Sequence, residues 1–164
     1  MRYVDYFCGI GGFRLGFEEA LLEYNLNGVC VDSCDIDKNA TRVYVQNFKD
    51  KHEVLKDIKT LDFTTIKDID ILFAGFPCQA FSSLGRRLGF DDDRGLLYLE
   101  LVRFLKESSP KYFLFENVPG FMYLNKGDNF KIVIKAFEDC GYYVIYKRLN
   151  TKYYGVPQSR ERVY

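Results

Sequence analysis

Three segments of the sequence carry side chains that could support nucleophilic chemistry. Cys78 lies in the segment GFPCQAFS, Glu116 in the segment FENVP, and Arg160 and Arg162 in the segment QSRER. A thiol in a loop can act as a nucleophile, a carboxyl group can hold or move a proton, and nearby arginines favour a thiolate. These residue types predict a site of covalent catalysis. Two of these segments also have a structural interpretation: Glu116 could cap a turn, and the two arginines could belong to an exposed, salt-bridged edge strand.

The remaining cysteines and the single histidine argue against a structural metal site and against a cysteine protease. Cys8, Cys30, Cys34 and Cys140 fall in or beside apolar segments, where cysteine usually acts as a small hydrophobic residue. There is no C-x-x-C pair, and His52 alone leaves a zinc site short of ligands, so we expect reduced thiols and no structural metal. The lack of a nearby histidine base also argues against a cysteine protease.

A glycine cluster, FCGIGGF, follows the first apolar run of the chain. Gly9, Gly11 and Gly12 would let the backbone approach a ligand at the start of the next helix, where free N–H groups point outward. Arg14 stands where the G-x-G-x-x-G pattern has its third glycine, and no Gly-Lys-Ser/Thr follows, which disfavours pyrophosphate and triphosphate ligands. A nucleotide-like cofactor and a tight structural turn both fit the glycines.

Acidic residues follow the next two apolar segments. Asp35 lies about 26 residues after the first glycine of the cluster, where a carboxylate could accept hydrogen bonds from ribose hydroxyls. Asp37 is better suited to cap the following helix. Asp57 could accept a hydrogen bond from an adenine amino group, with Ile36 and Ile58 covering the faces of the ring. Taken by itself, Asp57 fits a solvated loop residue better.

The elements that must position these residues alternate along the chain. Hydrophobic periodicity predicts helices over about 13–24, 40–48, 97–105 and 130–137, and strands at 3–7, 28–31, 54–55 (weak), 69–74, 111–115 and 142–146. This order predicts an α/β fold with a doubly wound, mostly parallel sheet and helices on both faces. In such sheets ligands bind beyond the carboxyl ends of the strands. The long segment 76–95 is therefore the first place to look for function.

Length and charge set further limits. The 164 residues are 48% hydrophobic and 28% charged, which suits one domain with a buried core. With 23 Lys and Arg against 23 Asp and Glu, the formal net charge is zero, so any nucleic-acid contact must be local. No apolar run approaches the roughly 20 residues that span a bilayer, and the N-terminus does not read as a signal peptide. We expect a soluble, cytoplasmic protein with no membrane partner.

Four segments together identify a family resemblance. FCGIGGFRLG (7–16), GFPCQAFS (75–82), ENV (116–118) and QSRER (158–162) resemble, in order and spacing, the motifs of DNA (cytosine-5)-methyltransferases. The resemblance covers essentially the whole chain. It implies a Rossmann-like methyltransferase fold, S-adenosylmethionine as cofactor with S-adenosylhomocysteine as product, no metal, and double-stranded DNA with a flipped cytosine as substrate.

The resemblance also implies roles for single residues. Cys78 would attack C6 of the cytosine, Glu116 would engage N3 and the amino group, and Arg162 would engage O2 with support from Arg160. The loop after Cys78 would close over DNA. Its implied DNA contacts are Gln79, Ser82, Ser83, Arg86 and Arg87.

The implied cofactor site draws on both halves of the chain. Its residues would be Phe7, Gly9, Gly11, Gly12, Asp35, Ile36, Asp57, Ile58, Pro77 and Leu97. Asp35 stands where the family usually has Glu, and Ile36 where it often has an aromatic residue. Both departures could weaken cofactor affinity.

Members of the family continue beyond the position of Tyr164 into a target-recognition domain and a segment that completes the cofactor pocket. We therefore expect residues 1–164 to form a single cofactor-binding and catalytic domain portion without that domain, of the restriction-modification type. A second polypeptide could carry the target-recognition region. The alternatives are a tRNA cytosine-5 methyltransferase, and a non-catalytic remnant or split-enzyme subunit that is inactive in isolation.

Overall fold

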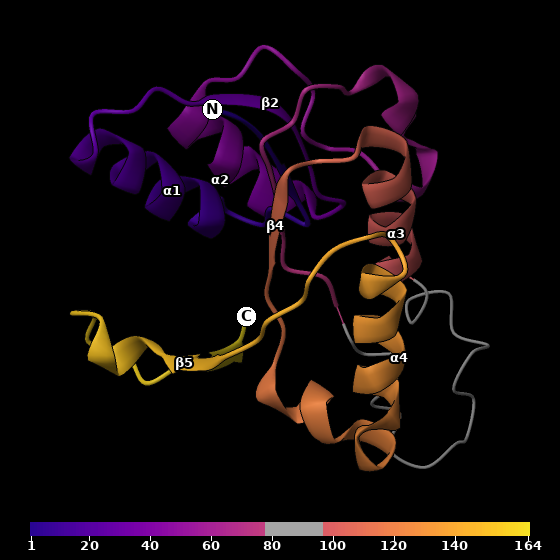
Figure 1. Cartoon of the computed structure of the whole chain (residues 1–164). Coiled ribbons are helices and arrows are strands. Elements are labelled where there is room, and N and C mark those ends of the chain that lie inside the picture. The colour runs from indigo at the N-terminus through magenta and orange to yellow at the C-terminus, as the bar shows by residue number, and fades with distance from the viewer. Residues whose placement is uncertain (78–96) are drawn as a thin grey trace. The chain divides into compact units, whose positions relative to one another are not determined.

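The computed structural model describes residues 1–77 and 97–164, and Figure 1 shows their helices and strands. The chain forms two compact units. The first consists of Met1–Gly75 with Glu107–Phe115, and the second of Phe76–Lys106 with Glu116–Tyr164. Each unit is described in its own right below.

The first unit is built on a parallel sheet of four strands in the order β2-β1-β3-β4. The strands are β1 (Arg2–Tyr6), β2 (Val29–Cys34), β3 (Ile71–Ala74) and β4 (Tyr112–Phe115). Tyr6 pairs with Cys34 on one side and with Ala74 on the other, and Ala74 pairs with Phe115. The strands therefore end level with one another, and the strand order reverses beside β1. In sheets of this kind the crevice at that reversal is where ligands bind.

Burial explains why these segments form strands. Tyr3, Val4 and Tyr6 of β1 are fully buried, as expected for a central parallel strand covered on both faces. The Tyr3 ring packs edge-on against Phe17 of helix α1 (Gly12–Glu23), with ring centroids 5.0 Å apart. The unit also contains helix α2 (Lys38–Phe48) and the short 3-10 helices η1 (Ile58–Thr60) and η2 (Phe63–Thr65).

The start of α2 confirms a local prediction. Asp37 Oδ1 accepts hydrogen bonds from the backbone N–H groups of Asn39 at 2.8 Å and Ala40 at 3.1 Å. Asp37 is therefore the N-cap of this helix, and its carboxylate satisfies donors that the helix itself leaves unpaired.

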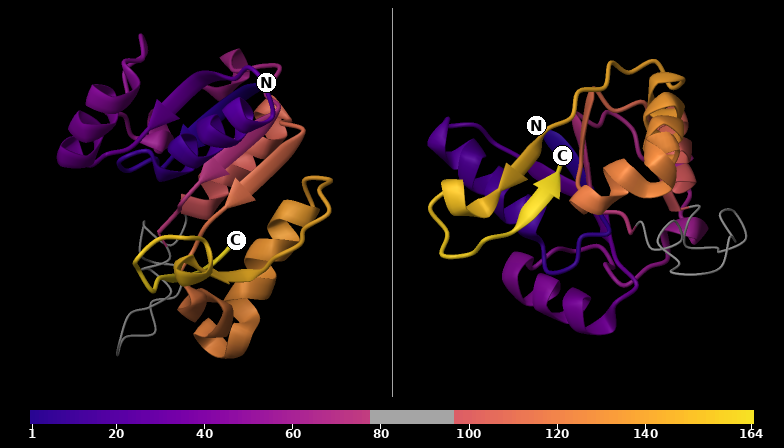
Figure 2. Two further views of the ribbon diagram at one scale, coloured as in Figure 1. Left: turned by 90° about the vertical axis from the view of Figure 1, so that its left-hand side faces the viewer. Right: turned by 90° about the horizontal axis from the view of Figure 1, so that it is seen from below.

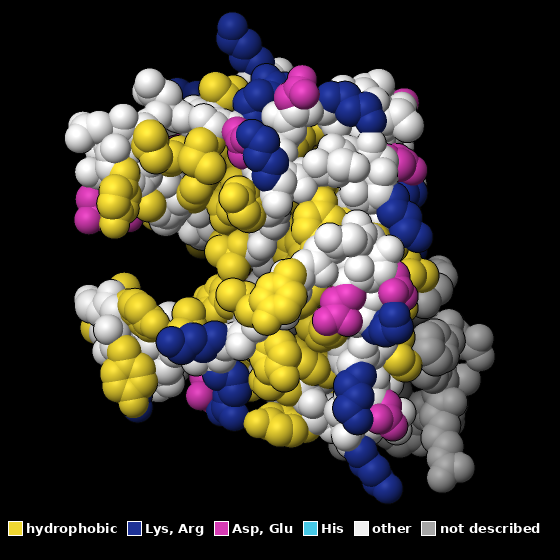
Figure 3. Space-filling model, viewed as in Figure 1, with side chains coloured by type: hydrophobic (Ala, Val, Ile, Leu, Met, Phe, Trp, Pro, Cys, Tyr) yellow, Lys and Arg dark blue, Asp and Glu magenta, His cyan; other side chains and the backbone are white. Residues whose placement is uncertain are grey.

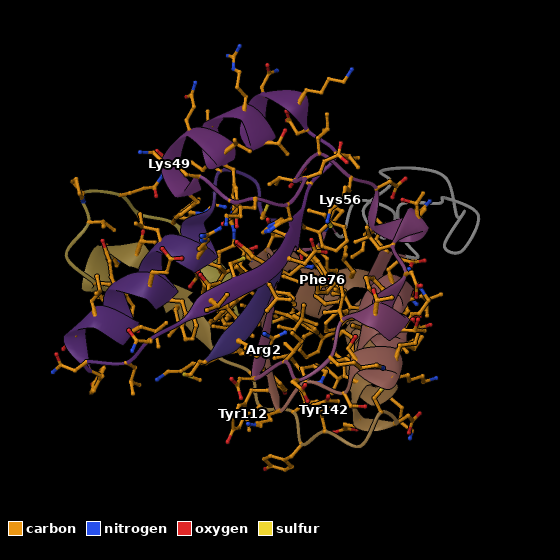
Figure 4. All side chains as sticks on the ribbon, turned by 90° about the horizontal axis from the view of Figure 1, so that it is seen from above. Arg2, Lys49, Lys56, Phe76, Tyr112 and Tyr142 are labelled. Carbon is orange, nitrogen blue, oxygen red and sulfur yellow. The ribbon has the colours of Figure 1, made fainter. Side chains whose placement is uncertain are left out.

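The second unit has a helical part and a two-stranded part. Its elements are α3 (Leu97–Ser108, whose last two residues belong to the first unit), η4 (Pro119–Gly127), α4 (Asp128–Glu138), β5 (Arg148–Asn150), η5 (Thr151–Tyr153) and β6 (Glu161–Val163). Strands β5 and β6 pair antiparallel and appear in yellow in Figure 2. Phe76, labelled in Figure 4, is buried and packs edge-on against Phe121, which packs in the same way against Phe130. This aromatic cluster forms part of the core of the unit.

The structure confirms the α/β class and the mostly parallel sheet, and corrects two predicted strands. The prediction of a strand at 142–146 is wrong, because pairing with β6 begins only at Lys147, opposite Tyr164. Tyr143 is 92% exposed and Ile145 is 78% exposed, so their apolar side chains do not pack as strand residues would. The weak strand at 54–55 is reduced to a single bridge between Leu55 and Asp35.

Exposed apolar side chains lie among polar and charged ones on the surface. On the face drawn in Figure 3, apolar side chains gather over the segment between β5 and β6, where Tyr153, Tyr154 and Val156 are exposed. Across residues 1–77 and 97–164, no helix has both the length and the apolar character needed to cross a bilayer.

Candidate active site

The glycine cluster forms a tight loop directly after β1. Phe7, Gly9 and Gly11 have positive φ angles of 53°, 54° and 93°. Cys8 N donates to Cys34 O at 3.2 Å, and Gly11 N donates to Cys8 O at 2.8 Å. A positive φ at a bulky residue such as Phe7 costs energy, and strain of this kind concentrates at functional sites. The loop is thus bound to the end of β2 and leads into α1 at Gly12.

Asp35 connects this loop to the segment after β2. Its Oδ2 accepts a hydrogen bond from Gly9 N at 2.8 Å, and its Oδ1 accepts one from Asp37 N at 2.9 Å. Its backbone is held by Val54 O at 3.0 Å and by Lys56 N at 3.1 Å. A carboxylate oxygen can accept more than one hydrogen bond, so both oxygens retain capacity for a ligand hydroxyl. The sequence analysis predicted a ligand contact here but not this bracing role.

The other predicted cofactor residues of the first unit lie in different environments. Ile36 is 70% exposed, whereas Ile58 is 3% exposed and belongs to the core. Of these two isoleucines, only Ile36 presents an open apolar surface. Asp57 is exposed, and its Oδ1 accepts a hydrogen bond from Lys59 N at 3.0 Å, which caps η1.

Asp5, in the middle of β1, is a titratable residue that the sequence analysis did not single out. It is fully buried, and within the described part of the chain neither carboxylate oxygen has a hydrogen-bond partner. Burial raises the pKa of Asp5 to about 8, although the positive charge of Arg14 opposes the shift. The signal in the sequence was an aspartate inside an otherwise apolar strand.

Three predicted catalytic residues of the second unit lie together. Arg162 Nε is 2.6 Å from Glu116 Oε1, and Arg160 Nη2 is 3.7 Å from the same oxygen. Arg160 directly precedes β6 and Arg162 lies within it, two residues further on, and both side chains approach Glu116. The side chain of Arg162 is 18% exposed and that of Arg160 is 49% exposed. The Glu116–Arg162 contact is therefore the shorter and the better shielded of the two.

Asn117, next to Glu116, organises the surrounding backbone and was missed as a site residue. Its Nδ2 donates to Phe76 O at 3.0 Å, and its Oδ1 accepts from Val118 N at 2.9 Å. Its backbone exchanges two hydrogen bonds of 2.9 Å with Val163 of β6. Asn117 therefore links the segment of Glu116 to two others. Its side chain holds the backbone at Phe76, and its backbone holds β6, the strand of Arg162. A buried asparagine directly after an apolar strand was the available signal.

The remaining predicted residues border the undescribed segment or fall within it. Pro77 and Leu97 flank it, and both are half-buried. The predicted nucleophile and DNA contacts lie outside the described residues: Cys78, Gln79, Ser82, Ser83, Arg86 and Arg87.

Comparison with known proteins gives consistent matches. Residues 1–164 match the family model described as C-5 cytosine-specific DNA methylase. The type II methyltransferase M.BanI of Aneurinibacillus aneurinilyticus is 44% identical over 164 residues, which are 100% of this chain and 37% of that protein. For the type II methyltransferase M.HhaI of Haemophilus parahaemolyticus, the identity is 42%, covering 100% of this chain and 48% of that one.

A solved structure extends the likeness to the fold. The Dnmt2 methyltransferase of S. pombe superposes with a TM-score of 0.76 at 28% identity, covering 99% of this chain and 49% of the other. The predicted Rossmann-like methyltransferase fold is thereby confirmed. The chain spans less than half the length of each of these three proteins.

Proposed function

The chain belongs to the C-5 cytosine-specific DNA methylase family, and from this premise we propose that it binds S-adenosylmethionine and carries the residues that methylate C5 of cytosine in DNA. The pairing of Glu116 with Arg162, directly after β4, is the observation that carries the proposal. Residues 1–164 then act as a single cofactor-binding and catalytic portion of a modification enzyme of the restriction-modification type. A cytoplasmic location, where DNA and cofactor are both present, belongs to the same proposal.

The glycine loop and Asp35 suit the proposed cofactor. When bound, S-adenosylmethionine supplies an electrophilic methyl group. The free acceptor capacity of Asp35 suits the ribose hydroxyls, and the exposed face of Ile36 suits the adenine ring. The loop would approach the methionine end of the cofactor, and Asp57 the adenine amino group. The wider proposed lining comprises Phe7, Gly9, Gly11, Gly12, Ile58, Pro77 and Leu97.

The proposed chemistry is nucleophilic catalysis by Cys78. Its Sγ forms a bond to C6 of the cytosine, and the electron pair displaced from the C5–C6 bond makes C5 nucleophilic. Glu116 holds a proton at N3, while Arg162 donates hydrogen bonds to O2, so negative charge on the ring is offset as it develops. After C5 has accepted a methyl group, loss of the C5 proton returns an electron pair to the ring. The Sγ–C6 bond then breaks and the thiolate leaves.

Arg160 has a supporting role in this scheme. It lies 3.7 Å from the carboxylate that Arg162 contacts at 2.6 Å, and it is half-exposed. We assign it to holding Glu116 in place rather than to direct contact with the base. This division of roles gives the two arginines different expected effects when they are replaced.

The proposed substrate is double-stranded DNA from which the target cytosine is flipped out, because C6 cannot be reached inside the base stack. Gln79, Ser82, Ser83, Arg86 and Arg87 are proposed phosphate or base contacts. A further region, on the same or a second polypeptide, would supply the remaining DNA contacts. Two observations support a contribution from such a region. The net charge of zero provides little general attraction for DNA, and the exposed apolar side chains of Tyr153, Tyr154 and Val156 could pack against a partner.

Covalent trapping tests the catalytic proposal. DNA that contains 5-fluorocytosine is incubated with cofactor, the chain, and a polypeptide that carries the part of M.BanI not matched by the chain. Fluorine cannot leave C5 as a proton does, so the Sγ–C6 bond persists and the adduct survives denaturation. Cys78→Ser should abolish the adduct, and the matched control Cys140→Ser should form it. A reconstituted enzyme that neither traps DNA nor transfers a methyl group would contradict the proposal.

Calorimetric titration with S-adenosylhomocysteine tests the cofactor proposal separately. Loss of a hydrogen bond to a charged group costs about 1.5–3 kcal/mol, so Asp35→Ala should weaken binding about 10- to 100-fold. Asp62→Ala is the matched control, because Asp62 caps η2 and lies outside the proposed lining. Equal affinities of the two variants would contradict the role assigned to Asp35.

A further inference from the structure

A second group of reactive side chains belongs to the first unit and shares no residue with the proposed catalytic set. Cys30 is on β2, and Asp50 and His52 follow α2. We propose that Cys30, Asp50 and His52 form a binding site for a divalent transition metal of the zinc class. This inference does not depend on the proposed function, because it concerns different residues and a different ligand.

The ligand atoms are close to the separation that a metal ion requires. The Cys30 sulfur, an Asp50 carboxylate oxygen and a His52 ring nitrogen all lie within 4.8 Å of one another. His52 Nε2 is 3.6 Å from Asp50 Oδ2. Ligands of a tetrahedral zinc ion stand about 3.3–3.6 Å apart, given metal–ligand distances of about 2.0–2.3 Å. The histidine and the aspartate already meet this spacing. Each remaining separation is at most about 1 Å too long.

The donor set selects the class of metal. One sulfur, one imidazole nitrogen and one carboxylate oxygen suit zinc or cobalt, whereas calcium and magnesium prefer oxygen ligands alone. Ser33 Oγ lies 2.7 Å from His52 Nε2, so the imidazole must give up this hydrogen bond when the nitrogen binds a metal. A water molecule would then fill the fourth position.

Arg14 is a second competing partner, because its guanidinium forms an ion pair with Asp50. Arg14 also contacts Glu18 Oε1 at 2.8 Å and the Tyr44 hydroxyl at 3.1 Å. It therefore keeps a carboxylate partner when Asp50 turns to a metal.

The local charges also balance when a metal binds. A divalent ion is neutralised by the Asp50 carboxylate and by the Cys30 thiolate, whose proton passes to solvent. Lys56, labelled in Figure 4, is a further cation of this region, and it is paired with Asp32. Metal binding therefore leaves both neighbouring cations with acidic partners.

This proposal departs from the expectation of no metal. That expectation rested on the spacing of cysteine and histidine along the chain, and the three ligands here are separated by 20 and 2 residues in no recognised pattern. Folding of the α2 end against β2 brings them together. The three residues are partly buried, so an ion can still reach the cluster from solvent.

Cobalt(II) titration of the purified chain tests the site directly. Coordination by Cys30 should produce thiolate-to-cobalt charge-transfer absorption that saturates at one equivalent and disappears when zinc is added. Loss of a residue that only supports a ligand already costs about 10- to 100-fold in affinity, so Cys30→Ser and His52→Asn should each weaken binding by at least about 100-fold. Cys140→Ser is the matched control thiol and should bind as the unaltered chain does.

A second measurement keeps the test decisive if the variants unfold. The chain has a single histidine, so its imidazole NMR signals belong to His52 without further assignment. One equivalent of zinc should shift these signals in the unaltered chain. The absence of cobalt absorption at one equivalent, unchanged His52 signals, or folded Cys30→Ser and His52→Asn variants with unaltered affinity would overturn the proposal.

Discussion

Replacing Gly11 by alanine should destabilise the first unit through two separate effects. The residue has φ +93°, a conformation that costs an L-residue about 1–2 kcal/mol. A Cβ atom there would also lie 2.2 Å from Phe48 Cε2 and 3.0 Å from Tyr44 Cδ2. The Phe48 ring must move to make room. Its movement is resisted by Arg14, whose guanidinium lies 4.3 Å from the ring centre.

The expected loss follows from adding these effects. Overpacking typically costs about 1–3 kcal/mol. Together with the backbone strain, we expect Gly11→Ala to lower the free energy of unfolding by about 2–5 kcal/mol. A domain of this size loses about 2–4 °C of Tm per kcal/mol, so a loss of about 3 kcal/mol lowers Tm by about 6–12 °C. Urea unfolding and thermal melts followed by circular dichroism measure both quantities.

Gly12→Ala is the matched control. Gly12 is the first residue of α1, its φ is not in the positive region, and a Cβ atom there meets nothing within 4 Å. Alanine at such a position should leave stability unchanged or raise it by about 0.4–1 kcal/mol, because it restricts the unfolded chain. Gly11→Ala within about 0.5 kcal/mol of the unaltered chain would refute this reasoning, as would equal destabilisation by both variants.

Three further predictions concern polar and charged side chains. Burial raises the pKa of Asp5 from 3.8 to about 8. Above about pH 4 the folded chain therefore keeps a proton that the unfolded chain has released. The free energy of unfolding should fall as the pH rises toward 8, by at most about 1.4 kcal/mol per pH unit. Asp5→Asn should flatten that slope in urea unfolding between about pH 5 and 8, and an unchanged slope would contradict the assignment. Asn117→Asp should lower the free energy of unfolding by about 2–4 kcal/mol, because it sets a carboxylate oxygen against Phe76 O; melts that match the unaltered chain would show that this contact is dispensable. In the trapping assay, Arg162→Ala should reduce adduct about 10- to 100-fold and Arg160→Ala less than about 5-fold, and the reverse order would contradict the roles assigned to the shorter and the longer contact.

The sequence by itself determined the elements whose signals are local. Strands β1, β3 and β4 followed from short apolar runs, and the helices followed from apolar residues at helical spacing, because both patterns reflect burial of a single segment. The cap at Asp37 was predictable for the same reason, since it depends on residues two and three positions away. The placement of Glu116 after a strand was predictable because parallel strands end at a common edge.

The tertiary structure decided everything that depends on residues distant in the chain. The segment 142–146 has the composition of a strand, but pairing requires a neighbour alongside, and β6 reaches only Lys147. Asp35 stabilises the glycine loop, in addition to being a candidate cofactor contact, because its carboxylate accepts a hydrogen bond from Gly9 N. The grouping of Cys30 with His52 had no sequence signal, because neither residue's local surroundings reveal which side chains will pack against it. Local periodicity records which face of a segment is buried, whereas the identity of the partner on that face is settled only when the segments pack together.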